Sequence, residues 1–293
     1  MSSSPLAERT IVITGAARGV GAALAREVAR RGARVALLGH EGPVLEAVAA
    51  ALPGPALALE ADVTDLPALE AAADSVRARL GRPSAVVANA GIAEGGALLD
   101  SDPAAWRRVI DVNLTGSSHT ARVFLPDLFG TAGYFLQVAS LASIGAAPLM
   151  SAYCASKAGV EAFAHSLRAE VAHRGVGVGI AYLNWTDTDM IRDADRYAVL
   201  RELRRHMPAP VRRVYPVDTV AAHMVRGMER RRTAVYAPPW LRLAQPIRPA
   251  MPPVVLRVAR RELPRLEASG PVRSTGPLGA GGLADRAAAG PGT

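Results

Sequence analysis

Short runs of apolar and β-branched residues alternate with longer segments of helical spacing along most of the chain. The short runs have the length and composition of buried strands, whereas the longer segments repeat apolar residues every three or four positions. Strands that alternate with helices in this way form crossover units, which place the strands parallel in one sheet. Strands are expected at residues 10–14, 34–38, 56–60, 85–88, 134–139, 176–183 and 234–236. Helices are expected at residues 20–31, 44–52, 67–80, 103–129, 151–173 and 217–229. The pattern therefore predicts a doubly wound α/β domain.

The regular alternation ends after the sixth expected strand. Residues 185–215 are polar and rich in arginine, which is typical of a mobile loop or of short helices. Prolines then recur, so residues 238–269 are expected to form a Pro/Arg-rich C-terminal extension with a short basic amphipathic helix at 254–266. Residues 270–293 are rich in Gly, Ala and Pro, a composition that predicts a disordered tail.

Composition narrows the class of protein. The chain has 293 residues, of which 50% are hydrophobic, enough to bury a sizeable core. No run approaches the ~18 uninterrupted apolar residues that predict a membrane span. The first residues lack the basic and apolar regions of a secretory signal, and the single cysteine, Cys154, excludes an internal disulfide framework. A cytoplasmic protein is therefore expected.

Basic residues are concentrated toward the C-terminus. Residues 1–191 carry a formal charge of −3, and residues 192–293 carry +11. A basic segment can contact acidic lipid headgroups, nucleic acid or an anionic substrate, but a solvated arginine-rich surface is the simpler interpretation. The chain has no nucleic-acid reader motif, so nucleic acid is not expected as a partner. Of the 34 basic residues, 33 are arginine, and the single lysine is Lys157.

A glycine-rich turn follows the first expected strand. Its glycines have the spacing G-x-x-x-G-x-G. Glycines between a strand and a helix let backbone N–H groups approach a pyrophosphate, and the N-terminus of the helix favours negative charge. The turn predicts a dinucleotide site, with a tight turn that binds no ligand as the alternative. The expected contacts are Gly15, Ala17, Arg18, Gly19, Val20 and Gly21.

The end of the second expected strand bears on the choice between NAD and NADP. An acidic residue there would hold the ribose hydroxyls and repel a 2′-phosphate, and Gly39 stands in its place. Arg18 lies in the glycine turn, where a guanidinium can pair with a 2′-phosphate, and His40 can add a contact. NADP(H) is therefore the favoured cofactor, while the nearby Glu41 keeps NAD(H) as the alternative.

Tyr153 and Lys157 are four residues apart within an expected helix, so both lie on one face. The ordinary pKa of a tyrosine, near 10, is a poor match for proton exchange near neutrality, and a neighbouring cation is expected to lower it. Tyr153 would then serve as a general acid in carbonyl reduction or as a base in alcohol oxidation. Ser140, at the end of the fifth strand, can hold the substrate oxygen or cap the next turn. Asn113 falls inside a helix, where it can hold a bend and a bridging water or face solvent.

Together these motifs resemble the classical short-chain dehydrogenase/reductase family, over about residues 8–237. The resemblance implies a Rossmann-like parallel sheet of about seven strands with helices on both faces. Residues 1–237 would then form a dinucleotide-binding catalytic domain that includes a substrate loop, residues 185–215. The resemblance also implies a homodimer or homotetramer. It rests on the glycine turn, Asp62-Val63, Asn89-Ala90-Gly91, Asn113, Ser140, Tyr153 and Lys157.

The resemblance assigns further roles in cofactor binding. Asp62 would hydrogen-bond the adenine, and Val63 would pack against it. Asn89 would steady the central strand, next to Ala90 and Gly91.

At the nicotinamide end, Lys157 would bind the ribose as well as lower the pKa of the tyrosine. Asn113 would anchor a water that relays protons, and Thr188 would contact the nicotinamide. The chain departs from the family pattern at Leu183-Asn184, where Pro-Gly is usual. Because asparagine tolerates the left-handed backbone that glycine would supply, the turn is expected to survive.

The expected walls of the substrate pocket are mostly apolar. Beyond Ser140 and Tyr153, the expected substrate contacts are Ile92, Leu149 and Trp185. Such walls suit an apolar carbonyl or secondary alcohol better than a phosphorylated sugar, and no metal site is predicted. The sequence thus predicts an NADP(H)-dependent oxidoreductase that interconverts an alcohol and a carbonyl. A catalytically silent dinucleotide-binding sensor or scaffold is the alternative, and epimerisation or dehydration on the same fold is a third interpretation.

The extension at residues 238–269 combines apolar residues with arginines. A basic amphipathic stretch can lie on an anionic membrane surface, which would make the protein peripheral at the membrane. Cover for an oligomer interface and packing over the substrate loop are the two alternatives.

Overall fold

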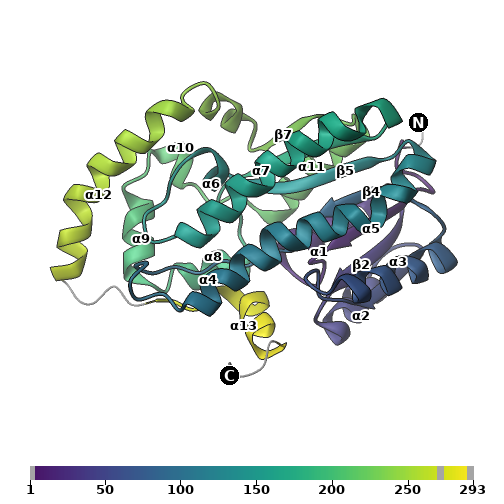
Figure 1. The fold of residues 1–293 in the computed structure, drawn as a ribbon, viewed down its shortest axis with the longest axis horizontal. Coiled ribbons are helices and arrows are strands. Elements are labelled where there is room, and N and C mark those ends of the chain that lie inside the picture. The colour runs from purple at the N-terminus through teal and green to yellow at the C-terminus, as the bar shows by residue number, and fades with distance from the viewer. Residues whose placement is uncertain (1–3, 269–273, 289–293) are drawn as a thin grey trace.

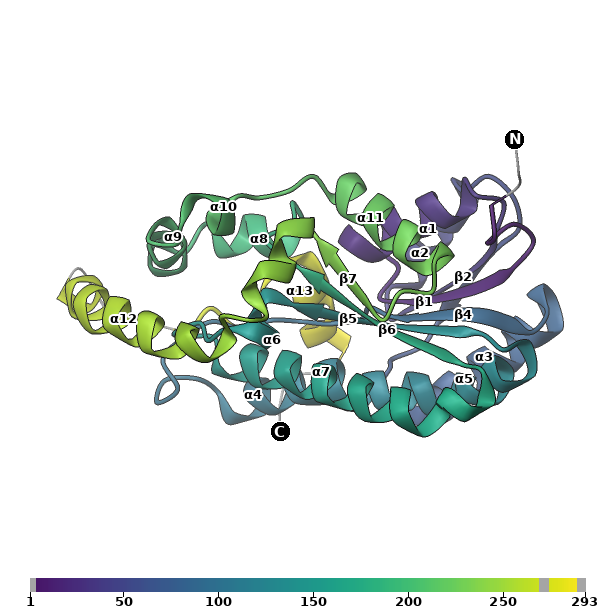
Figure 2. The same ribbon diagram turned by 90° about the horizontal axis from the view of Figure 1, so that it is seen from above.

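A seven-stranded parallel sheet forms the middle layer of the molecule (Figures 1 and 2). The structure is a computed structural model, and it describes residues 4–268 and 274–288. The strand order is β3-β2-β1-β4-β5-β6-β7, which confirms the predicted doubly wound Rossmann-like fold. The strands are β1 (Thr10–Thr14), β2 (Arg34–Gly39), β3 (Ala56–Glu60), β4 (Pro83–Ala88), β5 (Tyr134–Ser140), β6 (Gly177–Leu183) and β7 (Ala234–Ala237).

The order of the strands reverses between β1 and β4. The chain runs outward from β1 to β3, then crosses back to β4 on the other side of β1 and continues outward to β7. Connections that leave β1 and β4 on opposite sides open a crevice beyond the carboxyl ends of these strands. This reversal decides where a ligand can bind.

Helices cover both faces of the sheet (Figure 2). One face carries α1 (Gly19–Ala29), α2 (Gly42–Ala50) and α11 (Val217–Glu229). The other carries α3 (Leu66–Leu80), α4 (Pro103–Ile110), α5 (Gly116–Thr131) and α7 (Ser151–Val171). A short 3₁₀ helix, η2 (Ala172–Arg174), follows α7.

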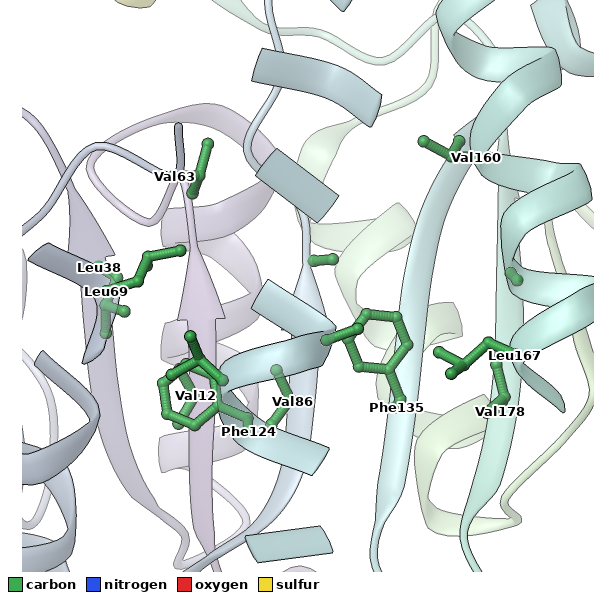
Figure 3. Packing of buried hydrophobic residues seen from close by; sticks show 14 of the residues in the cluster. Val12, Leu38, Val63, Leu69, Val86, Phe124, Phe135, Val160, Leu167 and Val178 are labelled. Atoms are coloured by element: carbon green, nitrogen blue, oxygen red, sulfur yellow. The ribbon is translucent and has the colours of Figure 1, made fainter. Parts of the chain in front are cut away.

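Each face of the sheet has its own core. Val12 and Phe135 belong to the core beneath α3, α5 and α7, where they pack in one cluster with Phe124 (Figure 3). Ile11 and Ile13 belong to the opposite core, beneath α1 and α11. Because successive side chains of a strand point to opposite faces, a strand buried on both faces reads as a continuous apolar run. This explains why the strands were recognisable in the sequence.

Between α4 and α5 the helix widens into a π-helical turn, η1 (Asp111–Thr115). One helix was expected over this region, in which Asn113 either holds a bend or faces solvent. The observed π turn is a local widening of the kind that often occurs at functional sites.

The expected loop at residues 185–215 contains three short helices. They are α8 (Asp189–Ala194), α9 (Ala198–Arg205) and α10 (Ala209–Arg212). Asn184 does not adopt the left-handed backbone that the sequence analysis considered for it, since the four non-glycine residues with positive φ in the described chain lie elsewhere. Its side-chain amide instead donates a hydrogen bond to the carbonyl of Val211, 3.0 Å away, and so ties the end of β6 to this segment.

The C-terminal extension folds back onto the domain. Two 3₁₀ helices, η3 (Pro239–Ala244) and η4 (Arg248–Ala250), lead to α12 (Met251–Ala268). Leu241 is fully buried, and Arg248 forms an ion pair with Glu161 at 3.0 Å. Helix α12 then extends along one edge of the molecule (Figure 1). Within the described residues, no helix combines the length and the apolar character needed to cross a membrane.

The structure corrects the expectation of a disordered tail over residues 270–293. Residues 274–288 are ordered and include α13 (Gly279–Ala288). Leu278 and Asp285 of this segment are buried, so an apolar contact and an ion pair supply the stabilisation that the composition alone does not indicate. Residues 270–273 and 289–293 lie outside the described part of the chain.

The interior strand β5 allows a matched test of the core. Leu136 on β5 is fully buried and Leu99 is 95% exposed. We expect Leu136→Ala to lower the free energy of unfolding by about 2–5 kcal/mol because it leaves a cavity, and we expect Leu99→Ala to change it little. Urea denaturation followed by circular dichroism measures both, and equal losses in the two variants would contradict the assignment of β5 to the core.

Candidate active site

A cleft runs along the carboxyl edge of the sheet, at the reversal between β1 and β4. All residues predicted to contact the dinucleotide line it, together with three of the residues predicted to contact the substrate. They are Gly15, Ala17, Arg18, Gly19, Val20, Gly21, His40, Asp62, Val63, Asn89, Ala90, Gly91, Ile92, Ser140, Tyr153, Lys157 and Thr188.

The glycine turn has room for backbone only. Gly15 and Gly19 have positive φ angles of 62° and 50°, a conformation that favours glycine. A Cβ atom on Gly21 would lie 2.1 Å from the carbonyl oxygen of Gly15, so any side chain there would collide. The first turn of α1 contains no acidic residue, and its N-cap residue, Arg18, makes no side-chain cap hydrogen bond within the described chain. The turn therefore offers a helix N-terminus suited to an anion such as a pyrophosphate.

Two side chains hold this turn against β4. The amide of Asn89 donates hydrogen bonds to the carbonyls of Thr14 and Gly15, at 2.9 and 3.1 Å. The hydroxyl of Thr14 accepts hydrogen bonds from the backbone N–H groups of Asn89 and Ala90, both at 3.1 Å. Asn89 thus links the ends of β1 and β4 at the point where the strand order reverses.

At the end of β2 the cleft is polar. The guanidinium of Arg18 pairs with the carboxylate of Glu41, with a shortest N–O distance of 2.7 Å, and this pairing raises the pKa of Arg18. The Nε2 atom of His40 is buried and has no hydrogen-bond partner among the described residues. An unpartnered buried nitrogen in the lining of a cleft fits a site where a ligand supplies the partner.

Asp62 and Val63 follow β3 at the far end of the cleft. Asp62 accepts hydrogen bonds from the N–H and the hydroxyl of Thr64, both at 2.8 Å, and from Arg108 at 2.5 Å. Burial raises the pKa of the Asp62 carboxyl, but these hydrogen bonds outweigh burial and lower it overall. Asp62 is therefore held as a carboxylate in a fixed orientation.

Ser140, Tyr153 and Lys157 come together at the opposite end of the cleft. Ser140 ends β5 and is also the N-cap of α6 (Leu141–Ile144), where its hydroxyl accepts a hydrogen bond from the N–H of Ala142 at 3.2 Å. Tyr153 and Lys157 lie one turn apart on α7. The ammonium of Lys157 donates to the carbonyl of Val138 at 3.4 Å and lies 5.7 Å from the centre of the tyrosine ring.

Burial governs the protonation of these two groups. It raises the pKa of the Tyr153 phenol above the ordinary 10.0, while hydrogen bonding with Ser140 acts in the opposite direction. Burial also lowers the pKa of Lys157 from 10.5 to about 8. From the sequence, a lowered pKa of the tyrosine was expected, and the structure corrects this direction. Removing the phenol from water disfavours the phenolate, and this outweighs the hydrogen bond with Ser140.

Asn113 lies outside the lining of the cleft and is buried behind it. Its Oδ1 accepts from the N–H of Ile92 at 2.8 Å, and its Nδ2 donates to the carbonyl of Ile92 at 3.0 Å and to the hydroxyl of Ser156 at 2.8 Å. These bonds fasten the loop after β4 to α7, so Asn113 acts on the site by positioning these two elements. Its expected role in a water relay stays a prediction.

A model of the short chain dehydrogenase family matches residues 9–197. The chain belongs to the short-chain dehydrogenase family. This confirms the resemblance noted in the sequence. In a solved structure, the short-chain dehydrogenase/reductase from Burkholderia phymatum in complex with NAD, the similar part covers 84% of this chain and 94% of that one, with a TM-score of 0.73 and 25% identity.

Curated members of the family are more similar in sequence. Cis-4-hydroxycyclohexanecarboxylate dehydrogenase from Sinomonas cyclohexanicum is 38% identical over 190 residues, which make up 63% of this chain and 76% of that protein. Meso-2,3-butanediol dehydrogenase from Serratia marcescens is 34% identical over 173 residues, 59% of this chain and 68% of that protein. The probable oxidoreductase EphD from Mycobacterium tuberculosis is 36% identical over 186 residues, which cover 62% of this chain. The chain spans only 31% of the length of EphD.

The residues expected in the substrate wall lie only in part along the cleft of this short-chain dehydrogenase. Ile92 lines the cleft, whereas Leu149 and Trp185 lie outside its lining. The ring of Trp185 instead packs under the guanidinium of Arg204, 5.3 Å from the ring centre. Met190 on α8 lines the cleft near the catalytic end. Trp185 and Met190 belong to a segment that forms short helices, and its sequence spacing alone does not reveal which of its side chains face the cleft.

Several residues that line the cleft were not predicted from the sequence. They come from the C-terminal segment and are Leu278, Gly279, Gly281, Gly282 and Asp285. The composition of this segment resembles that of disordered tails. The available signal was small: two leucines and one aspartate in a stretch otherwise rich in Gly and Ala.

The lowered pKa of Lys157 predicts a pH-dependent stability. The unfolded chain holds the lysine proton up to about pH 10.5, and the folded chain only to about pH 8. The protonated lysine therefore disfavours the folded state, and the contribution of Lys157 to stability rises between pH 8 and pH 10.5. We expect Lys157→Met to be more stable relative to the wild type below pH 8, with an advantage on the order of 3 kcal/mol that fades toward pH 10.5.

Urea denaturation of the wild type and Lys157→Met between pH 7 and pH 10 measures this difference. Tyrosines and Cys154 titrate in both proteins, and the chain has no other lysine, so the difference isolates Lys157. A difference that does not change with pH would rule out the buried, weakly basic amine.

Proposed function

We propose that this short-chain dehydrogenase interconverts an alcohol and a carbonyl with a nicotinamide dinucleotide. The observation that carries the proposal is one cleft that holds a glycine cradle at a helix N-terminus and, at its other end, Ser140, Tyr153 and Lys157. The printed names of two relatives, a hydroxycyclohexanecarboxylate dehydrogenase and a butanediol dehydrogenase, support a hydroxyl-bearing substrate.

In this mechanism Ser140 and Tyr153 bind the substrate oxygen between their hydroxyls. A bound nicotinamide supplies the hydride in reduction and accepts it in oxidation. The raised pKa of Tyr153 keeps the phenol protonated near neutrality, which suits it to donate a proton to the oxygen of a carbonyl as it is reduced. In the oxidative direction the phenol of Tyr153 first loses its own proton to solvent, and its phenolate oxygen then takes the proton from the alcohol.

Lys157 would bind the ribose next to the nicotinamide. Its amine lies beneath Gly91, where an added Cβ atom would be 3.4 Å from Nζ. With a pKa of about 8 the amine is mostly protonated at neutral pH, so it offers N–H donors to ribose hydroxyls. Asn113 positions the loop that contains Gly91.

The wall near Tyr153 favours a small apolar substrate. Tyr153 packs with Ala93, Met150, Met190 and Leu278 in one apolar cluster. A silent sensor or scaffold on the same fold is the second candidate, and epimerisation or dehydration the third, but a sensor has no need of a serine, a phenol and an amine brought together at one end of the cleft.

Tyr153→Phe tests the catalytic assignment. We expect the variant to bind NADPH as tightly as the wild type, because the phenol hydroxyl serves in proton transfer and adds little to the affinity for the cofactor. We expect kcat to fall by about 10²–10⁴-fold, the usual contribution of a general acid. NADPH fluorescence titration and NADPH consumption with a panel of small ketones measure the two quantities.

The control is Tyr236→Phe, which removes the same atom from β7, where the ring stacks on Tyr182 away from the cleft. It should keep the wild-type rate. Equal rates in wild type and Tyr153→Phe would reject the role of Tyr153, and loss of rate in both variants would point to a structural effect.

We further propose NADP(H) as the preferred cofactor. Gly39 leaves the end of β2 without an acid, and Arg18 lies beside it at the mouth of the cleft with 40% of its side chain exposed. Glu41 opposes this preference, since a 2′-phosphate has to replace its carboxylate at the guanidinium. The pair thus sets the balance between the two cofactors.

Substitutions at the two partners test this balance. We expect Arg18→Ala to weaken NADPH binding by roughly tenfold or more, the contribution of a hydrogen bond between charged groups, and to change NADH binding little. Glu41→Gln should strengthen NADPH binding. Arg26→Ala, which removes an arginine from the same helix that pairs weakly with Asp218, is the control. Fluorescence titration with both cofactors decides: equal losses of NADPH and NADH in Arg18→Ala would refute recognition of the 2′-phosphate.

The remaining expectations about partners stay predictions. Helix α12 and the turns before it expose Leu243, Ile247, Val254 and Leu256 among arginines, an arrangement compatible with contact to an anionic membrane surface. A homodimer or homotetramer and a cytoplasmic location likewise stay predictions.

A further inference from the structure

Residues 274–288, which we call the strap, form one wall of the cleft although they lie more than a hundred residues after Tyr153 in the sequence. In Figure 1 the strap and its helix α13 are the yellow elements at the C-terminal end of the chain, next to α4 and α8. The roles assigned above to the glycine turn and the catalytic residues leave this wall unexplained.

Backbone hydrogen bonds hold the beginning of the strap to the loop after β4. Thr275 donates to the carbonyl of Gly95 at 2.7 Å, and Leu278 donates to the carbonyl of Ala93 at 2.8 Å. In return the N–H of Gly95 donates to the hydroxyl of Thr275 at 2.9 Å. This short antiparallel pairing fixes the strap in one register beside the catalytic end of the cleft.

Helix α13 is held by carboxylates at both of its ends. The N–H of Gly279 donates to Asp193 of α8 at 2.9 Å. Asp285 pairs with Arg108 of α4 through two hydrogen bonds, at 2.6 and 3.0 Å. We call the ion pair between Asp285 and Arg108 the latch of the strap. Arg108 also binds Asp62, so one guanidinium holds both the strap and the end of the cleft where an adenine is expected. The pKa of Arg108 is raised, first of all by its hydrogen bond to Asp285.

Leu278 brings an apolar side chain to the catalytic end. It is 2% exposed and lies in one cluster with Ala93 and Ala194, against which Met150, Tyr153 and Met190 pack. A leucine so placed removes volume from the space in front of the phenol.

We propose that the strap completes the catalytic pocket and that Leu278 limits the size of the substrate that reaches Tyr153. This inference rests on the proposed function and deepens it by naming a residue that sets specificity. Replacing leucine by alanine removes three carbons from the wall, and a change of that size in an apolar pocket alters discrimination by about tenfold or more.

The first test compares two leucines of the strap. Leu278→Ala enlarges the pocket, whereas Leu283→Ala makes the same change at a position that is 58% exposed. The ratio of kcat/KM for 4-phenyl-2-butanone to that for 2-butanone, with NADPH, should rise about tenfold in Leu278→Ala and stay unchanged in Leu283→Ala. No rise in Leu278→Ala, or the same rise in both variants, overturns the proposal.

The second test does not depend on turnover. Hydrogen exchange followed by mass spectrometry should show protected amides at Thr275 and Leu278 in the wild type, with and without saturating NADPH. In Asp285→Asn the exchange rate of these amides should rise about tenfold, because the ion pair with Arg108 is weakened. In Arg286→Gln, which changes an exposed neighbour, the exchange rate should stay as in the wild type. Unprotected amides in the wild type overturn the proposal, and so does protection that disappears on adding NADPH, since the strap would then compete with the cofactor.

The two tests separate this proposal from the function on which it rests. A wild type that reduces neither ketone rejects the proposed function. Protected amides that persist with NADPH would in that case still support a strap that completes the cleft.

Discussion

The hydrogen bonds between Thr14 and Asn89 join the ends of β1 and β4, and the geometry of the cleft depends on them. A crevice forms where the chain leaves two neighbouring parallel strands toward opposite sides of the sheet, but a crevice alone does not orient a ligand. The Asn89 amide also holds Gly15, and through Gly15 the start of α1. The cradle for the pyrophosphate and the loop that leads to Gly91 are therefore held together by the same side chain.

Burial is the second constraint, and it acts on both groups that handle the proton. The phenol of Tyr153 becomes a weaker acid and the amine of Lys157 a weaker base than either would be in water. Both shifts follow from the cost of placing a charge in a region of low polarity. The catalytic end of the cleft thus favours neutral side chains, and charge enters it only where a hydrogen bond or a ligand compensates.

The sequence predicts the sheet well because its strands are buried on both faces. Each expected strand lies within two residues of the observed one, since a continuous apolar run ends where burial ends. The glycine turn was also predictable, because only glycine fits its backbone and the spacing is visible in the chain. The residues expected to contact the dinucleotide consequently all line one cleft.

What the sequence could not supply depends on tertiary contacts. The direction of the Tyr153 pKa shift follows from burial, and burial is a property of the folded chain. Leu149 and Trp185 were expected in the substrate wall, but neither lines the cleft, and the ring of Trp185 packs against Arg204 instead. The strap was expected to be disordered because of its composition. The contacts that order it, such as the ion pair between Asp285 and Arg108, link positions far apart in the sequence, and composition does not reveal them.

The placement of Lys157 has a practical consequence. It carries the only side-chain amine of the chain, and that amine lies at the inner end of the cleft. Isotopic labelling of lysine would therefore give a single side-chain resonance in a magnetic resonance spectrum, without any assignment. That resonance would report directly on the position where the ribose of a nicotinamide cofactor is expected to bind.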